Sequence, residues 1–210
     1  MVQRIIGLFV CTLVAGDAAA QDVWIGAAID YAAHRFAEAP DTDRLDGAAP
    51  AVTILSGARV WQHLAARLEW SRDGRMTDVE SITLDVAGRA VTIQSTLAQR
   101  SRALTALGGF THGLSSRVRI AYLIGAAFTH VERSFETNAP GLILPGRAPL
   151  PSAISTQEDD FIALAGGIDA IIRVHQAINI ATGARFQELE LDPELSGRRI
   201  SGFAGLVWVF

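Results

Sequence analysis

The chain has 210 residues, of which 50% are apolar and 19% are charged. An intrinsically disordered chain combines few apolar residues with much charge, so this composition excludes one. The net charge is -4 and all 18 basic residues are Arg, which leaves no broad cationic surface for nucleic acid. The single cysteine, Cys11, excludes a disulfide scaffold and a multi-cysteine metal site. We therefore expect no nucleic-acid partner and no cofactor.

Residues 1–20 have the pattern of a secretory signal peptide. A basic opening ends at Arg4, an apolar run follows from Ile5 to Ala15, and small residues stand at Ala18 and Ala20. The apolar run is shorter than the ~20 residues that a membrane-spanning helix needs. We expect cleavage after Ala20, which makes 1–20 the signal peptide and 21–210 the mature domain.

The central feature of the mature chain is a long alternation of apolar and polar or small residues. The clearest case is the run from Arg117 to Thr129, and it recurs from Gln62 to Trp70, Phe161 to Arg173 and Gln176 to Gln187. A period of two places successive side chains on opposite faces of a strand. These runs exceed the ~5–6 residues of an average soluble strand and suit tilted bilayer-crossing strands of ~9–11 residues. Small residues on the polar face suit the narrow interior of a small barrel.

The sequence thus predicts an all-β fold, an eight-stranded antiparallel up-and-down transmembrane β-barrel. Short and long connections alternate along the chain, as expected for tight periplasmic turns and longer outer loops. The alternative is ten strands, with an added pair near Val86–Gly88. The eight expected strands are Asp22–Phe36, Ala51–Val60, Gln62–Asp85, Arg89–Thr111, Ser116–Phe135, Asp159–Val174, Gln176–Leu191 and Arg199–Phe210.

Charged residues on the polar face are expected to point into the lumen. Isolated ions are costly to desolvate there, so we expect Arg–carboxylate pairs that plug the barrel. The expected lumen network comprises Asp30, Arg59, Arg67, Glu69, Arg117, Arg119, Asp169, Arg173 and Arg185, with His34 and Gln187 on the same face. Aromatic residues are expected at the two membrane interfaces. Those at the periplasmic interface are Trp24, Trp61, Trp208 and Phe210, and those at the outer interface are Tyr31, Phe36, Trp70, Phe128 and Phe186.

The last strand ends on an aromatic residue. Every second position back from the C-terminus gives one face, Phe210, Trp208, Leu206 and Ala204. Together with the signal peptide and the long alternating strands, this resembles the terminal strand of bacterial outer-membrane β-barrel proteins. Residues 22–210 resemble the small eight-stranded group that includes OmpA-like transmembrane domains and porin-family or opacity-type surface proteins.

This resemblance implies location in the outer membrane of a Gram-negative bacterium and contact with outer-membrane lipid and lipopolysaccharide. It also implies an assembly machinery that reads the C-terminal strand through Leu206, Trp208 and Phe210. We expect a non-enzymatic structural or surface-interaction role, with the segments Ala37–Pro50, Asp73–Arg89 and Thr137–Glu158 presented outside.

The sequence is also compatible with three other functions. The first is a narrow porin-like channel for ions or small solutes, in which the excess of inward Arg favours anions. The second is a lipid A-modifying enzyme, whose candidate residues are His130, Ser134 and either Glu132 or Glu136. The third is a soluble periplasmic carrier of the lipocalin type. The segment around His130 matches no known deacylase motif, so we expect no catalysis.

Overall fold

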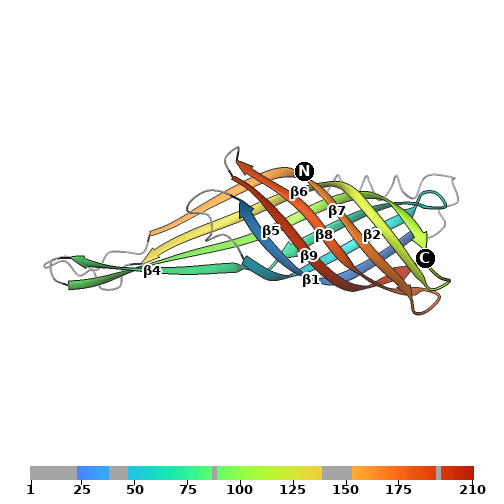
Figure 1. Ribbon diagram of the computed structural model, residues 1–210, viewed down its shortest axis with the longest axis horizontal. Coiled ribbons are helices and arrows are strands. Elements are labelled where there is room, and N and C mark those ends of the chain that lie inside the picture. The colour runs from blue at the N-terminus through green and yellow to red at the C-terminus, as the bar shows by residue number, and fades with distance from the viewer. Residues whose placement is uncertain (1–22, 38–46, 87–88, 139–152, 193–194) are drawn as a thin grey trace.

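The computed structural model of the chain describes residues 23–37, 47–86, 89–138, 153–192 and 195–210. The expected signal peptide lies outside these residues. The described chain is all β-strand apart from short turns (Figure 1). Its strands are β1 (Val23–Ala37), β2 (Gly47–Arg59), β3 (Leu64–Asp73), β4 (Met76–Val86), β5 (Arg89–Gly113), β6 (Val118–Asn138), β7 (Ala153–Arg173), β8 (Ile178–Asp192) and β9 (Leu195–Val209).

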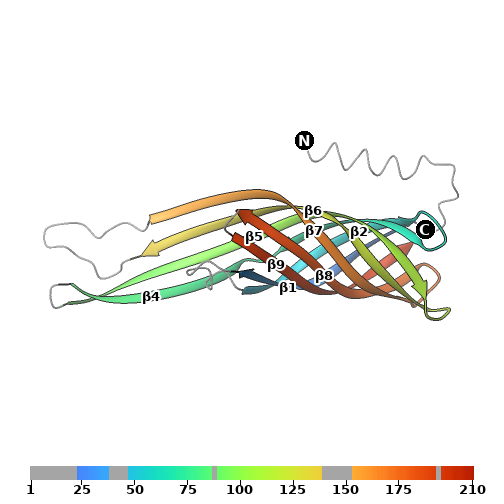
Figure 2. The same cartoon turned by 45° about the horizontal axis from the view of Figure 1, so that its top comes forward.

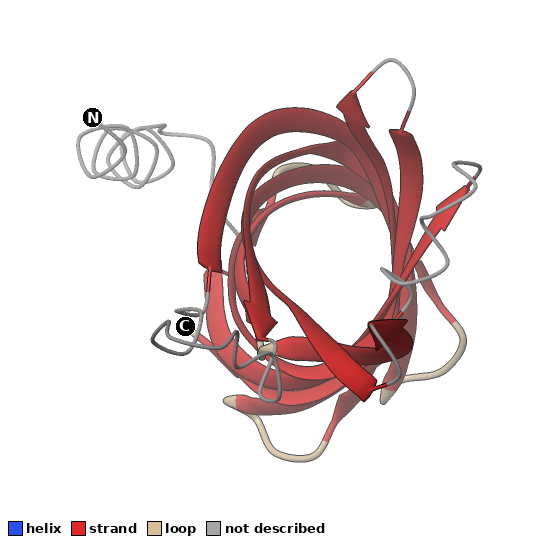
Figure 3. Ribbon diagram, turned by 90° about the vertical axis from the view of Figure 1, so that its left-hand side faces the viewer, coloured by secondary structure: helices blue, strands red, loops and turns tan. Residues whose placement is uncertain are grey.

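Eight of these strands close into an antiparallel ring, seen end-on in Figure 3. Neighbouring strands follow the chain order, and the ring closes because β1 pairs with β9. Residues Arg102–Phe110 of β5 pair with β3, and residues Arg89–Gln99 of β5 pair with β4. Thus β4 continues the course of β3 and adds no strand to the ring. The prediction of an eight-stranded up-and-down barrel is confirmed, and the described residues contain no ten-stranded ring.

The expected single strand Gln62–Asp85 is wrong in one detail, because Gly74 and Arg75 interrupt it. Asp73 and Met76 are both buried although they are three positions apart, so the alternation of faces shifts here. An extra residue in one strand has this effect, as in a β-bulge. The Gly74 amide donates a 2.7 Å hydrogen bond to the carbonyl of Pro50 on β2, which keeps the segment attached to the barrel.

Several strands run further toward the long-connection end than predicted. β2 begins at Gly47 and β7 at Ala153, inside segments expected to be loops. Beyond the ring, β4 pairs with β5 and β6 pairs with β7 up to Thr137. Backbone pairing satisfies the peptide groups at the starts of β2 and β7 without a regular apolar alternation, which is why the sequence does not reveal these two extensions. The expected strands Gln62–Asp85 and Arg89–Thr111 already cover nearly all of β4 and β5. Among the described strands, β4 and β5 project furthest from the barrel (Figures 1 and 2).

Most large apolar side chains face outward, whereas polar and small side chains, with a few large apolar ones such as Leu55, Leu107 and Phe203, face the lumen. Ile29, Ile124 and Ile162 have 72%, 66% and 74% of their surface exposed, whereas Asp169 is fully buried. Much of the barrel interior is alanine, namely Ala28, Ala32, Ala121, Ala127 and Ala181. A soluble β-sandwich would have the reverse arrangement, with apolar side chains enclosed.

The two ends of the barrel differ. One end carries the short turns 60–63, 114–117 and 174–177 together with the C-terminus (Figure 2). Exposed aromatic side chains mark this end, namely Trp61, Phe110, Trp208 and Phe210. A second exposed set lies toward the opposite end, namely Tyr31, Trp70, Phe128 and Phe186. We call these the turn end and the loop end.

No helix among the described residues is both long and apolar enough to cross a bilayer.

Candidate functional site: a buried ion cluster in the lumen

Four charged side chains meet inside the barrel, Arg67 and Glu69 from β3, Asp169 from β7 and Arg185 from β8. Each lies on the inward face of its strand because its neighbours in sequence point outward. Each has at most 8% of its surface exposed. We refer to these four residues as the central cluster. With two guanidinium groups and two carboxylates, it is neutral overall.

Each guanidinium group of the central cluster contacts both carboxylates. The Nε of Arg185 donates to Glu69 Oε2 at 3.0 Å, and its Nη2 donates to Oε1 at 2.6 Å. The same guanidinium also donates to both carboxylate oxygens of Asp169. Arg67 Nη1 pairs with Asp169 and lies 3.2 Å from Glu69 Oε1. Bidentate pairing of this kind offsets the desolvation of buried ions.

Two aromatic rings pack against the central cluster. The Arg67 guanidinium carbon lies 4.6 Å from the ring centre of Trp24, and that of Arg185 lies 4.6 Å from the ring centre of Phe203. Such cation–π contacts add to the stabilisation of a desolvated guanidinium. The prediction that Trp24 lies at the membrane interface is therefore wrong. Trp24 shares the inward face of β1 with Asp30, which the alternation along β1 already indicates.

A second cluster lies nearer the loop end and centres on Asp73. Arg199 donates to it through Nε at 3.0 Å and Nη2 at 2.6 Å, and His34 Nε2 lies 2.9 Å from its Oδ2. The Ser101 hydroxyl donates to the same carboxylate. We call these four residues the upper cluster. Sequence reasoning missed Asp73 and Arg199, although Asp73 continues the two-residue spacing of Arg67 and Glu69.

Other polar contacts line the rest of the lumen. The Thr53 hydroxyl donates to the carboxylate of Asp30, and the Gln187 amide donates to Thr129. Toward the loop end, Arg133 Nη2 donates to Asp159 at 2.9 Å. Arg133 was not among the expected lumen residues, because its part of β6 was taken to lie at the strand end.

The remaining expected lumen residues lie at the turn end. Arg59 and Arg119 are partly buried and line an internal cavity. Arg117 and Arg173 are exposed, and the expectation that they join the lumen network is wrong. Arg117 lies in the turn 114–117, and Arg173 is the last residue of β7. Alternation gives the face of a residue but not its height along the barrel, which explains the error.

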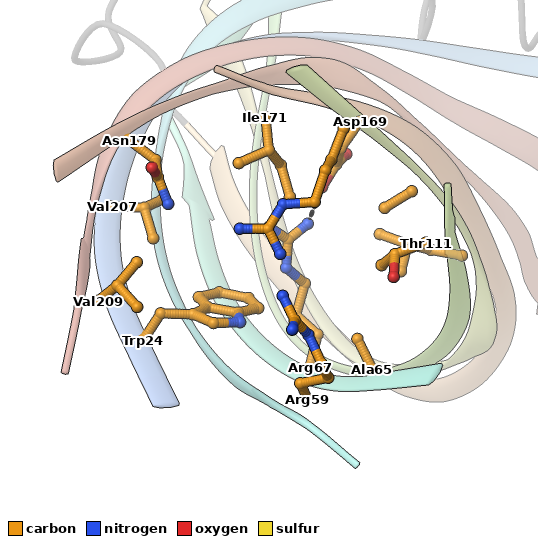
Figure 4. Close-up of a pocket in the computed structure, with 13 residues that line it drawn as sticks. Trp24, Arg59, Ala65, Arg67, Thr111, Asp169, Ile171, Asn179, Val207 and Val209 are labelled. Atoms are coloured by element: carbon orange, nitrogen blue, oxygen red, sulfur yellow. Dashed lines mark hydrogen bonds and ion pairs between the residues drawn. The ribbon is translucent and has the colours of Figure 1, made fainter. Parts of the chain in front are cut away.

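The internal cavity has a volume of about 60 Å³, enough for a few water molecules. In Figure 4, Arg59, Arg67 and Trp24 lie on one side of it and Ile171 and Asp169 on another. Arg67 and Asp169 belong to the central cluster, which therefore bounds the cavity. Apolar side chains supply most of the remaining lining, including Leu123, Val207 and Val209.

The candidate catalytic residues do not come together. His130 and Ser134 lie four positions apart on β6, a separation of about 13 Å that excludes a hydrogen bond between them. His130 Nδ1 instead bonds Asp160 on β7 at 2.7 Å. Within the described part of the chain, His, Cys, Asp and Glu residues form no group of three or more suited to a metal ion.

No protein-family model and no curated protein sequence matches this chain. Solved structures with a similar fold are numerous. The crystal structure of Ail, the attachment invasion locus protein of Yersinia pestis, is 13% identical, with a TM-score of 0.51 over 89% of this chain and 98% of that one. Ail in complex with the heparin analogue sucrose octasulfate is 14% identical, with a TM-score of 0.50 over 90% and 99% of the two chains. The outer membrane protein OprG from Pseudomonas aeruginosa is 8% identical, with a TM-score of 0.48 over 90% and 95%.

These similarities, at low sequence identity, concern the fold. They agree with the closed ring of antiparallel strands. The chain has the fold of the small bacterial outer-membrane β-barrel proteins.

Proposed function

We propose that this chain is a non-enzymatic barrel of the Gram-negative outer membrane with a structural or surface-interaction role and a plugged lumen. Residues 1–20 serve as its export signal. The observation that carries the proposal is the contact between Glu69 and Arg185. Their strands, β3 and β8, stand on opposite sides of the eight-stranded ring, so one bonded pair reaches across the lumen.

The central cluster opposes ion flow for an electrostatic reason. A permeating ion has to displace at least one bonded partner and leave the other charge buried. Breaking a buried ion pair in this way costs about 3–5 kcal/mol. The upper cluster adds a second barrier, since Asp73 and Arg199 join β3 to β9 nearer the loop end.

The surface role is assigned to the loop end, and above all to the projecting β4–β5 hairpin. One edge of β4 pairs with β5, and the other edge is paired with no strand among the described residues. Val79, Ile82 and Leu84 on this strand are 49%, 48% and 45% exposed. An unpaired edge with apolar side chains is suited to binding an extended segment of another protein by strand addition.

The partners that follow from this function are outer-membrane lipid, lipopolysaccharide and the assembly machinery. The outward apolar band supports lipid contact. Leu206, Trp208 and Phe210 lie on the outward face at the end of the chain, with exposed fractions of 46%, 42% and 80%. That position supports their role as the assembly signal of the C-terminal strand.

Conductance across a planar lipid bilayer tests the plug. The wild-type barrel is expected to insert without steady ion conductance, and the double variant Glu69→Ala/Arg185→Ala is expected to conduct. The matched control Arg133→Ala/Asp159→Ala removes a pair at the loop end and leaves the central cluster intact, so it stays closed. A wild-type barrel that conducts steadily contradicts the plugged lumen.

A narrow channel is the second candidate, because the turn-end cavity is lined by Arg59, Arg67 and Arg119. If the barrel is a channel of this kind, the wild-type protein conducts ions, and Arg59→Ala or Arg119→Ala lowers its preference for anions.

Enzymatic modification of lipid A is tested by mass spectrometry of lipid A from cells with and without the protein. We expect no difference between the two samples.

A further inference from the structure

Two arginines face each other on the outer surface of the barrel, Arg72 on β3 and Arg102 on β5. They are directly opposite in the strand register, and both are exposed. Neither guanidinium group makes an ion pair or hydrogen bond with a described residue. Like charges placed directly opposite across two strands destabilise the sheet. An anion between them would remove this repulsion.

The surface beneath the two arginines is apolar. The next outward positions toward the turn end are Trp70, Leu104 and Phe128, which are directly opposite one another on β3, β5 and β6. Together with Arg102 they line a surface hollow of about 440 Å³. A second hollow of about 230 Å³ adjoins it and is lined by both arginines and Trp70. The site therefore has an apolar floor and a basic rim.

Arg72 and Arg102 lie at the level where the outward face of the barrel changes from apolar to polar. On β6 the outward side chains are apolar up to Phe128, and the next two are His130 and Glu132. A bilayer around the apolar band therefore has its headgroups at the level of Arg72 and Arg102. Basic side chains at this depth attract anionic lipid headgroups, and a guanidinium binds phosphate through paired hydrogen bonds.

Acidic side chains limit the site on one side. Glu132 and Glu158 line the second hollow, and Asp160 lines the first. The Asp160 carboxylate already has a partner, because His130 Nδ1 lies 2.7 Å from its Oδ1. An anion is therefore favoured on the β3–β5 side of the hollow, between the two arginines.

We propose that Arg72 and Arg102 bind the phosphate of a phosphorylated lipid in the outer leaflet, with its acyl chains against Trp70, Leu104 and Phe128. This proposal rests on the proposed function, because it requires a bilayer around the apolar band. It assigns a specific lipid site on β3, β5 and β6, where the general band supplies only non-specific contact.

Native mass spectrometry of the detergent-solubilised barrel, titrated with bisphosphorylated lipid A, tests the site. The double variant Arg72→Gln/Arg102→Gln is expected to bind lipid A about 30-fold more weakly, because each basic residue near a membrane surface contributes about 1 kcal/mol. The matched control is Arg35→Gln/Arg198→Gln. Those arginines are also outward and directly opposite, but Arg198 is paired in register with Glu188. The control is expected to bind as the wild type does.

The second part of the experiment uses dephosphorylated lipid A. The wild type is expected to bind it as weakly as the double variant binds bisphosphorylated lipid A. Equal affinity of wild type and double variant, or equal affinity for both lipids, overturns the lipid site. Heat-dependent gel migration establishes that each variant is folded. A wild-type barrel that inserts into vesicles but shows no phosphate-dependent binding rejects this site alone. A folded wild-type barrel that does not insert rejects the proposed function as well.

Discussion

Arg185 and Glu69 stand on opposite sides of the barrel and bond each other across the lumen, with Nη2 and Oε1 2.6 Å apart. A contact of this kind is feasible only in a narrow ring, and the diameter of the ring follows from its eight strands and their stagger. The many inward alanines leave room in this lumen for the long side chains of the pair.

Removing one charge of the central cluster should destabilise the barrel strongly. Glu69→Gln leaves two guanidinium groups beside the single carboxylate of Asp169, all of them buried. We expect the free energy of unfolding to fall by about 3–5 kcal/mol, measured by urea denaturation in detergent. The control Glu158→Gln changes an exposed carboxylate and is expected to alter stability by less than about 0.5 kcal/mol. Equal effects of the two substitutions contradict a buried charge network.

The upper cluster should show coupling between Asp73 and Arg199. Asp73→Leu alone leaves Arg199 buried without its carboxylate, whereas Asp73→Leu/Arg199→Leu removes both charges. We therefore expect the double variant to be less destabilised than the sum of the two single variants, with a coupling free energy of about 0.5–3 kcal/mol. Urea denaturation of the four proteins in the cycle measures it. Additive effects show that the two side chains act independently.

Trp24 should be shielded from lipid, unlike the other tryptophans. It packs on Arg67 inside the barrel, whereas Trp61 and Trp208 are 71% and 42% exposed. In variants that keep one tryptophan and replace the others by Phe, brominated acyl chains should quench Trp61 and Trp208 but not Trp24. Quenching of Trp24 to the same extent as Trp208 would place it on the lipid face after all.

Close packing between strands should make Gly125 costly to replace. A Cβ added at Gly125 on β6 would collide with the backbone carbonyl of Ala106, whereas one added at Gly108 on β5 would meet nothing within 4 Å. Gly125→Ala is expected to lower the free energy of unfolding by about 1–3 kcal/mol. Gly108→Ala is the matched control on the neighbouring strand and should leave stability unchanged or slightly raised. Urea denaturation in detergent compares them, and equal stability of both variants argues against close contact at Gly125.

Much of the fold could be predicted from the alternation of side chains, because a period of two identifies a strand and separates its faces. It indicated the inward face for Arg67, Glu69, Asp169 and Arg185, all of which are buried. The alternation of short and long connections predicted the up-and-down ring of eight strands.

The pairing of these residues could not be predicted. Which residues meet across the lumen depends on the stagger between strands, and this is set by the whole closed ring. Asp73 was missed because the expected strand Gln62–Asp85 is longer than a bilayer crossing, so the segment from Asp73 to Arg89 was expected to project outside the membrane. Arg117 was given the correct face but not its height, so it was placed in the lumen although it lies exposed in a turn.

The orientation of the two strand faces is the claim on which the account depends, and photolabelling from the lipid tests it most directly. The wild-type barrel is reconstituted in lipid whose acyl chains carry a diazirine, irradiated, and analysed residue by residue by mass spectrometry. We predict label on the outward positions of β6 and β7, including Ile124 and Ile162, and none on the buried Thr129 and Asp169. Label on Thr129 and Asp169 with none on Ile124 and Ile162 would contradict the account.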